Sequence, residues 1–149
     1  MDDSFVAPLL YRFQNQSRFC SGNEIVESVR LNIEGLLNSR LSIPPNYLLR
    51  ATDQDAIDCL NVSLVNFGVV DFQSLNMGDP LMEKRFCKSI QLSIERYEPR
   101  LDNIEVGMST SINNRLINTE VTGRLVVEPF ETIRFDSGLD PVNQAFVVS

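Results

Sequence analysis

The residues of this chain that are best suited to chemistry are Glu98 and Arg100, which stand on either side of Pro99. Proline lacks a backbone donor and disfavours a helical conformation for the residue before it, so a helix should end at residue 97 or 98. An arginine pairs with a carboxylate through two parallel hydrogen bonds, and a carboxylate accepts from arginine or backbone donors. Glu98 and Arg100 could therefore hold a partner protein at a fixed angle. They could also pair with each other, as a brace inside the chain or as a solvated ion pair at a helix end.

A catalytic role for Glu98 is another possibility. Glycoside cleavage needs two carboxyl groups about 5–10 Å apart, one of them kept protonated in an apolar pocket. Glu98 lies between Arg96 and Arg100, and these cations favour the ionised carboxylate. The sequence offers no histidine, no glycine-rich phosphate loop and no nucleophile with a neighbouring base. We therefore expect no enzyme activity and no cofactor.

The chain is acidic, with a formal net charge of −7 at pH 7. This charge argues against binding to nucleic acid or to an anionic membrane, because phosphate recognition needs clustered lysine and arginine. Residues 83–100 differ, with five basic and three acidic side chains. These are Lys84, Arg85, Lys88, Arg96 and Arg100 against Glu83, Glu95 and Glu98. A basic stretch on an acidic protein indicates a protein partner.

The three cysteines, Cys20, Cys59 and Cys87, are far apart and set among apolar residues. We expect buried thiols in a reducing compartment. A zinc site is not expected, because the chain has no histidine and no close cysteine pair. The sequence has no apolar run of membrane-spanning length, and Asp2 and Asp3 stand where a signal peptide would be basic. These features predict a cytoplasmic protein without membrane insertion.

Two long helices are predicted to position the corner at residues 98–100. The first covers residues 23–38, with a capping box formed by Ser21 and Glu24. Its apolar face consists of Ile25, Val26, Val29, Ile33, Leu36 and Leu37. The second begins at Asp79-Pro80 and runs to the corner, with Met82, Phe86, Ile90, Ile94 and Tyr97 on one face. Residues 53–67 between them suggest a shorter helix capped by Gly68, although the valines at 62, 65, 69 and 70 leave a strand possible.

Beyond the corner, the alternation of apolar and polar residues predicts an antiparallel sheet. We expect strands at residues 104–112 and 116–127, joined by a turn at Asn113-Asn114, and a short strand at residues 132–135. A loop at residues 137–141 then precedes an apolar tail. The predicted fold class is α+β, a single domain with helices packed on one face of a small antiparallel β-sheet. Residues 1–20 are predicted as an N-terminal docking arm and residues 21–149 as the domain itself.

Four stretches of the chain, in the same order, resemble one protein family. They are residues 7–13, 28–40, 63–72 and 97–101 with the strand that follows, the last containing Glu98-Pro99-Arg100. The family is TssE, the small baseplate wedge subunit of bacterial type VI secretion systems, which is homologous to the lysozyme-like baseplate wedge protein of contractile phage tails. Residues 41–50 and the tail after Phe135 depart from the family pattern.

This resemblance implies a structural role, in which residues 21–149 form a baseplate wedge domain that links the wedge to the contractile sheath and helps to initiate sheath assembly. The implied partners are the large wedge subunits TssF and TssG, TssK in the wider baseplate, and the sheath proteins TssB and TssC, with the baseplate docked at the inner membrane complex. The implied interaction residues are Tyr97, Glu98, Pro99, Arg100, Leu101, Asn38 and Arg40.

The chain could contact the sheath by strand addition, for which the hairpin edge near residues 118–126 is the candidate. The alternative is that the tail of the same chain covers this edge. Two other functions remain to be weighed against the structural role, namely a peptidoglycan-cleaving lysozyme-like enzyme and a free-standing protein-binding adaptor.

Overall fold

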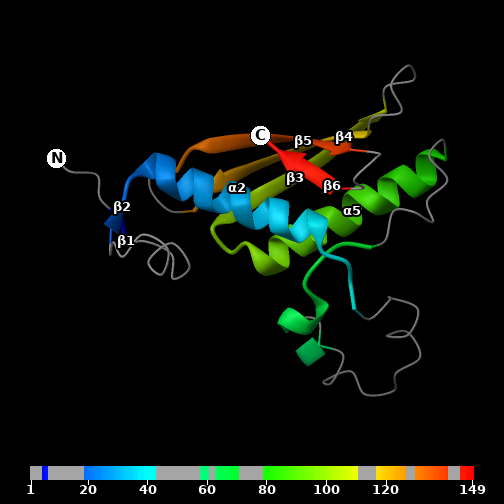
Figure 1. Cartoon of the computed structure of the whole chain (residues 1–149), viewed down its shortest axis with the longest axis horizontal. Coiled ribbons are helices and arrows are strands. Elements are labelled where there is room, and N and C mark those ends of the chain that lie inside the picture. Colours follow the sequence, from blue (N-terminus) through cyan, green and yellow to red (C-terminus); the bar gives the residue numbers. More distant parts are fainter. Residues whose placement is uncertain are drawn as a thin grey trace.

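The computed structural model describes residues 5–6, 19–42, 58–60, 63–70, 79–110, 117–126, 130–140 and 145–149. Two long helices and a four-stranded antiparallel sheet make up most of this part of the chain (Figure 1). The predicted docking arm lies largely outside the described residues. Within it, β1 (Phe5–Val6) pairs with β2 (Phe19–Cys20), and the division at residue 20 stays a prediction.

Helix α2 (Gly22–Asn38) begins and packs as its sequence predicts. Glu24 N donates to Ser21 Oγ at 3.4 Å, and Ser21 N donates to the Glu24 carboxylate at 2.6 Å, which completes the capping box. The buried face consists of Ile25, Val29, Ile33, Leu36 and Leu37, with Val26 partly buried beside them. The helical period brings these apolar side chains together, so α2 is held by packing against the core.

Helix α5 (Pro80–Tyr97) also follows its sequence signals. Leu81 N donates to the side chain of the N-cap Asp79 at 2.9 Å. Phe86, Ile90 and Ile94 are buried. No helix in the described part of the chain has the length and apolar character needed to cross a membrane.

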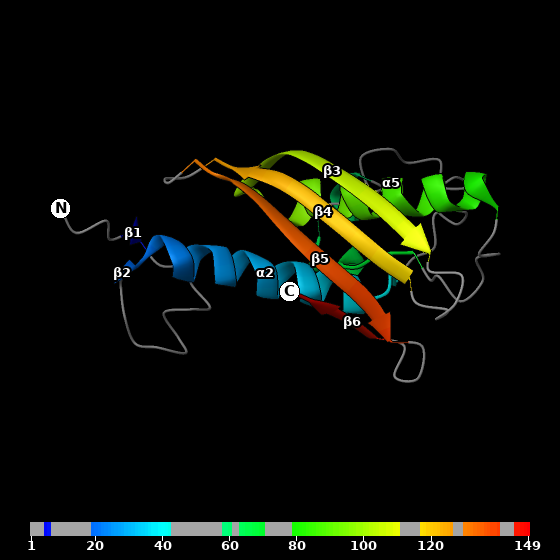
Figure 2. The same ribbon diagram turned by 90° about the horizontal axis from the view of Figure 1, so that it is seen from above.

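The sheet contains β3 (Leu101–Thr110), β4 (Ile117–Leu125), β5 (Thr132–Asp140) and β6 (Ala145–Val148), in that order. All neighbouring strands are antiparallel. Figures 1 and 2 show both long helices on one side of the sheet, α5 along β3 and α2 along β6. The predicted α+β architecture is therefore confirmed.

The core lies between the sheet and the two helices. The sheet contributes Leu101, Ile104, Val121, Leu125, Ile133, Phe135, Phe146 and Val148. Because side chains alternate along a strand, the residues between them form the opposite face, which is exposed or partly exposed and, apart from Val147, mostly polar. The sheet thus has one face for folding and one face toward solvent.

The segment before α5 differs from its prediction. Instead of one helix ending at Gly68, residues 58–60 are helical and η1 (Leu64–Asn66) is a short 3-10 helix. Val69 then forms a parallel bridge with Arg40. Gly68 has a φ of +135°, and a Cβ there would come within 2.7 Å of the Ser39 backbone. The glycine is therefore required by the close approach of two chain segments, and not by a helix end. The predicted start of that helix, residues 53–57, lies outside the described residues.

The C-terminal half of the sheet also differs from its prediction. The loop expected at residues 137–141 is strand as far as Asp140, and the apolar tail is strand β6. Ser137 and Gly138 pair with β4 on one side and β6 on the other, so two ladders outweigh their weak strand propensity.

Strand β4 is central, because β3 pairs with it on one side and β5 on the other, so the prediction of an edge near residues 118–126 is wrong. The edges of the sheet are β3 and β6 instead. The predicted Asn113-Asn114 turn lies outside the described residues.

Candidate functional site

The corner after α5 is closed by an ion pair inside the chain. Arg100 Nε donates to Glu98 Oε1 at 2.6 Å, and Arg100 Nη2 donates to Glu98 Oε2 at 2.6 Å. The Glu98 side chain is 1% exposed and that of Arg100 is 23% exposed. Among the alternatives left open by the sequence, the solvated ion pair is wrong, and the internal brace is the arrangement observed.

Two polar side chains of α2 complete the corner. Asn32 Nδ2 donates to Glu98 Oε2 at 2.9 Å and lies 3.3 Å from Tyr97 O. Arg100 Nη1 donates to Ser28 Oγ at 3.1 Å, and the Arg100 backbone N–H lies 3.3 Å from Glu98 Oε1. These donors offset the cost of removing the Glu98 charge from water. The end of α5 and the start of β3 are thereby tied to α2.

The other corner residues have different surroundings. Tyr97 Oη donates to Ser63 O at 2.8 Å, and its ring meets Phe67 edge to face with 5.2 Å between ring centroids. Leu101 is buried in the core, whereas Pro99 is exposed. Among the five predicted interaction residues at the corner, the accessible surface therefore comes from Pro99 with the partly exposed Tyr97 and Arg100.

Asn38 lies away from the corner, at the C-terminal end of α2. It is six residues beyond Asn32, which corresponds to about 9 Å along the helix. Its Oδ1 accepts from Phe146 N at 2.7 Å and its Nδ2 donates to Phe146 O at 2.9 Å. One side-chain amide thus binds both backbone groups of a β6 residue. Arg40, two residues on, donates from Nη1 to Leu37 O at 2.9 Å and so caps the helix.

Arg30 adds a second contact between α2 and β6, where its Nη1 donates to Val148 O. The same guanidinium forms ion pairs with Glu27 and Glu34, each at 2.7 Å. The hydrogen bond from Arg30 lowers the pKa of Glu27, and the hydrogen bonds to Glu27 and Glu34 raise the pKa of Arg30. The two carboxylates hold the guanidinium against the strand. We call the side of β6 bound by Asn38 and Arg30 the covered edge.

The direction of the backbone groups in β4 determines what faces outward on β3. Val126 N donates to Arg100 O at 2.9 Å, and Leu125 N donates to Glu131 O at 2.9 Å. Backbone groups alternate along an antiparallel strand, so the even-numbered residues of β4 turn toward β3 and the odd-numbered ones toward β5.

Two residues of β3 stand opposite odd-numbered residues of β4, since Val106 pairs with Val121 and Met108 with Thr119. Their own N–H and C=O groups therefore point away from β4. Within the described part of the chain, no hydrogen bond reaches these groups. We call the outward backbone groups of Val106 and Met108 the free edge.

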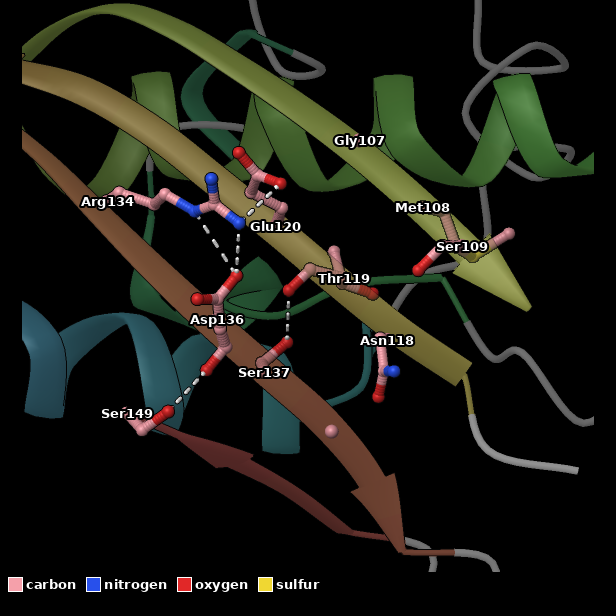
Figure 3. Close-up of a pocket in the computed structure, with 11 residues that line it drawn as sticks. Gly107, Met108, Ser109, Asn118, Thr119, Glu120, Arg134, Asp136, Ser137 and Ser149 are labelled. Atoms are coloured by element: carbon pink, nitrogen blue, oxygen red, sulfur yellow. Dashed lines mark hydrogen bonds and ion pairs between the residues drawn. The ribbon is translucent and has the colours of Figure 1, made fainter. Parts of the chain in front are cut away.

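The polar face of the sheet has a hollow of about 580 Å³ over Gly107 and Gly138 (Figure 3). Arg134 Nη2 lies 3.0 Å from Glu120 Oε2 and 3.3 Å from Asp136 Oδ1, as the dashed lines show. These charges pair with one another on the surface, where such pairs contribute little to stability.

Sequence reasoning missed Ser28, Arg30 and Asn32. Each borders the apolar face of α2 and lies next to a buried residue in the sequence. A polar residue at the border of an apolar helix face is the one signal in the sequence that points to such a contact. Most polar residues at such borders are solvated, so the signal is weak. Their partners lie 66 to 118 positions away in the chain, so the pattern could not reveal them.

The cysteines differ in part from their prediction. Cys59 and Cys87 are free thiols, Cys59 exposed and Cys87 partly buried. The prediction of buried thiols is therefore wrong for Cys59. Burial, and then the nearby charge of Glu83, raise the pKa of Cys87.

We compared the chain with known protein families and solved structures. The family model described as baseplate wedge protein gp25 matches residues 23–129, which include α2, the corner, β3 and β4. No curated protein matches the chain. A chain in the solved structure titled "The baseplate complex from the type VI secretion system" has a similar fold, with a TM-score of 0.54 and 15% identity over 79% of this chain and 96% of that chain. The predicted resemblance is thus confirmed, and the chain belongs to the baseplate wedge protein gp25 family.

Proposed function

We propose that this protein is a structural subunit of a type VI secretion baseplate and that it joins the wedge to the contractile sheath through the free edge of β3. The observation that carries the proposal is the difference between the two edges of the sheet. A strand edge with unpaired backbone groups binds an extended segment through main-chain hydrogen bonds. The family of the chain and its likeness to a chain of a type VI baseplate complex support this setting.

The proposed occupant of the free edge is a strand of the sheath proteins TssB and TssC. The Glu98–Arg100 pair fixes where β3 begins relative to α2 and α5. A strand added to β3 would therefore be held at a defined angle to the rest of the subunit. We propose that sheath assembly begins on this strand and takes its orientation from it.

The large wedge subunits TssF and TssG are proposed to dock at the C-terminal end of α5, near the corner. Pro99 is exposed there, and η1, held by Tyr97, exposes Leu64 and Val65 by 82% and 58%. Neighbouring exposed apolar residues indicate a surface that a partner buries. In this arrangement TssK belongs to the wider baseplate, and the assembly is cytoplasmic, docked at the inner membrane complex.

Proline at Val106 tests the free edge. The substitution removes an N–H that points away from β4, and proline is tolerated at such positions of edge strands. We expect Val106→Pro to fold and to co-purify with TssF and TssG, but to abolish sheath formation in cells. Val106→Thr keeps the N–H and the β-branched shape, so it should form sheaths.

Full-length sheaths in cells carrying a folded Val106→Pro protein would exclude the free edge as the sheath contact. If the unaltered protein co-purified with no baseplate or sheath component, a free-standing adaptor would be the better description.

We do not propose a lysozyme-like activity. The Glu98 carboxylate is bound by Arg100 and Asn32 and is 1% exposed, whereas a general acid must be protonated and reach its substrate. The assay is the turbidity of a peptidoglycan suspension, which we expect to stay constant. A fall in turbidity that Glu98→Gln abolishes would support the enzyme instead.

A further inference from the structure

A groove runs beside the free edge, between α5 and β3. It has a volume of about 360 Å³ and is lined by Glu83, Lys84, Cys87 and Lys88 of α5 together with Val106 and Met108 of β3. Figure 2 shows the arrangement of the two elements, with the N-terminal half of α5 on the side of β3 that lies away from β4. We call this hollow the side groove.

The side groove lies where an added strand would place its side chains. Val106 and Met108 are partly buried and pack against the core, so their side chains point toward the helices. Residues paired across two strands share one face of the sheet. Every second residue of a strand bonded to the free edge would therefore enter the side groove, while the residues between would face solvent.

The chemistry of the side groove is apolar at its base and basic at its rim. Val106, Met108 and the half-buried thiol of Cys87 supply the apolar surface, and a methionine adapts to side chains of different shape. Lys84 and Lys88 are exposed, one helical turn apart. Lys88 Nζ lies 3.3 Å from Gln91 Oε1, and within the described residues no ion pair involves either lysine. Glu83 is the one acidic residue of the lining.

We propose that the strand received by the free edge carries apolar side chains at alternate positions, which fill the side groove against Cys87, Val106 and Met108, and an acidic residue beside them, which pairs with Lys84 or Lys88. This inference rests on the proposed function, because it requires a strand on β3. It adds the side-chain pattern by which β3 selects that strand.

Three capped heptapeptides test the pattern. In the first, Glu-Thr-Val-Thr-Val-Thr-Glu, the two valines and the two terminal glutamates share one face of the strand; in the second, lysines replace the glutamates; in the third, serines replace the valines. The readout is the rate at which iodoacetamide alkylates Cys87 in the full chain carrying Cys20→Ser and Cys59→Ser. Occupation of the side groove shields the thiol, so binding appears as slower alkylation.

We expect the first peptide to protect Cys87 at a concentration about tenfold lower than either other peptide, because only it has both apolar and acidic groups. The double variant Lys84→Glu/Lys88→Glu should reverse the preference between the glutamate and lysine peptides. Equal protection by the glutamate and lysine peptides, protection by the serine peptide as strong as by the first, or no protection by any peptide would overturn the inference.

Sheath formation in cells separates this inference from the proposed function. If Val106→Pro abolishes sheaths and Lys84→Glu/Lys88→Glu does not change them, strand addition stands and the side-chain pattern fails. If Val106→Pro forms normal sheaths, the proposed function itself fails.

Discussion

The two edges of the sheet differ in whether side chains bind their outward backbone groups. At the covered edge, Asn38 and Arg30 of α2 bind the backbone of Phe146 and Val148. At the free edge, the backbone of Val106 and Met108 points outward beside a groove. An unpaired edge invites association, and proteins usually block it. Because α2 covers the backbone of β6, β3 is the edge at which we propose that a strand is added.

The edges also differ in length and regularity. Strand β6 has four residues, whereas β3 has ten. The ladder between β3 and β4 is interrupted between Asp102 and Glu105, where Asn103 has a φ of +50°. This bulge lies at the corner end of β3, and the ladder is regular from Glu105 onward. The regular part of β3 is thus the part that carries the free edge.

The largest loss of stability is expected at the corner where β3 begins. Arg100→Ala leaves the buried Glu98 charge without its partner, so the free energy of unfolding should fall by about 3–5 kcal/mol. Arg96→Ala removes an exposed arginine of the same helix end and should change it by less than about 1 kcal/mol. Chemical denaturation of both variants measures the difference. An Arg100→Ala protein that is as stable as the Arg96→Ala protein but fails to bind the wedge subunits would make Arg100 an interface residue.

The second-largest loss of stability is expected at Gly68, which packs against the backbone of Ser39, the residue after Asn38. Gly68→Ala forces a Cβ against the Ser39 backbone at a φ of +135°, and we expect a loss of about 2 kcal/mol or more. Gly35→Ala is the matched control, since no atom lies within 4 Å of a Cβ built there. Because Gly35 is inside α2, alanine should stabilise the protein by about 0.5–1 kcal/mol. Thermal melts compare the two, and equal shifts would contradict this account of Gly68.

The covered edge itself can be opened. Asn38→Ala removes both hydrogen bonds to Phe146, at a cost of about 1–2 kcal/mol. The Phe146 amide should then exchange with solvent about tenfold faster, while the Val147 amide, which faces β5, changes less. Leu31→Ala, at an exposed position of the same helix, should leave both amides unchanged. Unaltered exchange at Phe146 in Asn38→Ala would show that the amide does not protect this edge.

The smallest loss of stability is expected for an exposed ion pair, which can be compared with the buried pair of Glu98 and Arg100. Arg124 donates to Asp102 at 3.1 and 3.2 Å, but its side chain is 53% exposed. Arg124→Ala should therefore cost no more than about 1 kcal/mol, and less at high salt. A loss comparable to that of Arg100→Ala would mean that burial is not what distinguishes the two pairs.

Local sequence determined the long elements of this fold. The capping box at Ser21 and the Asp79-Pro80 start set where α2 and α5 begin, and Pro99 ends α5. Apolar residues at the helical period chose the buried faces, and alternation beyond residue 101 produced strands. These signals act between residues a few positions apart, so a single sequence contains them in full.

Only the tertiary structure decided which edge is free and what the corner does. Strand order depends on pairing between distant segments, and residues 137–140 became strand because both neighbours bind them. Glu98 is buried because Asn32 and Ser28, on another helix, meet the corner. Asn38 covers β6 by binding Phe146, which lies 108 positions further along the chain. The residue types were visible in the sequence, but their partners were not, because packing brings them together only after the elements have formed.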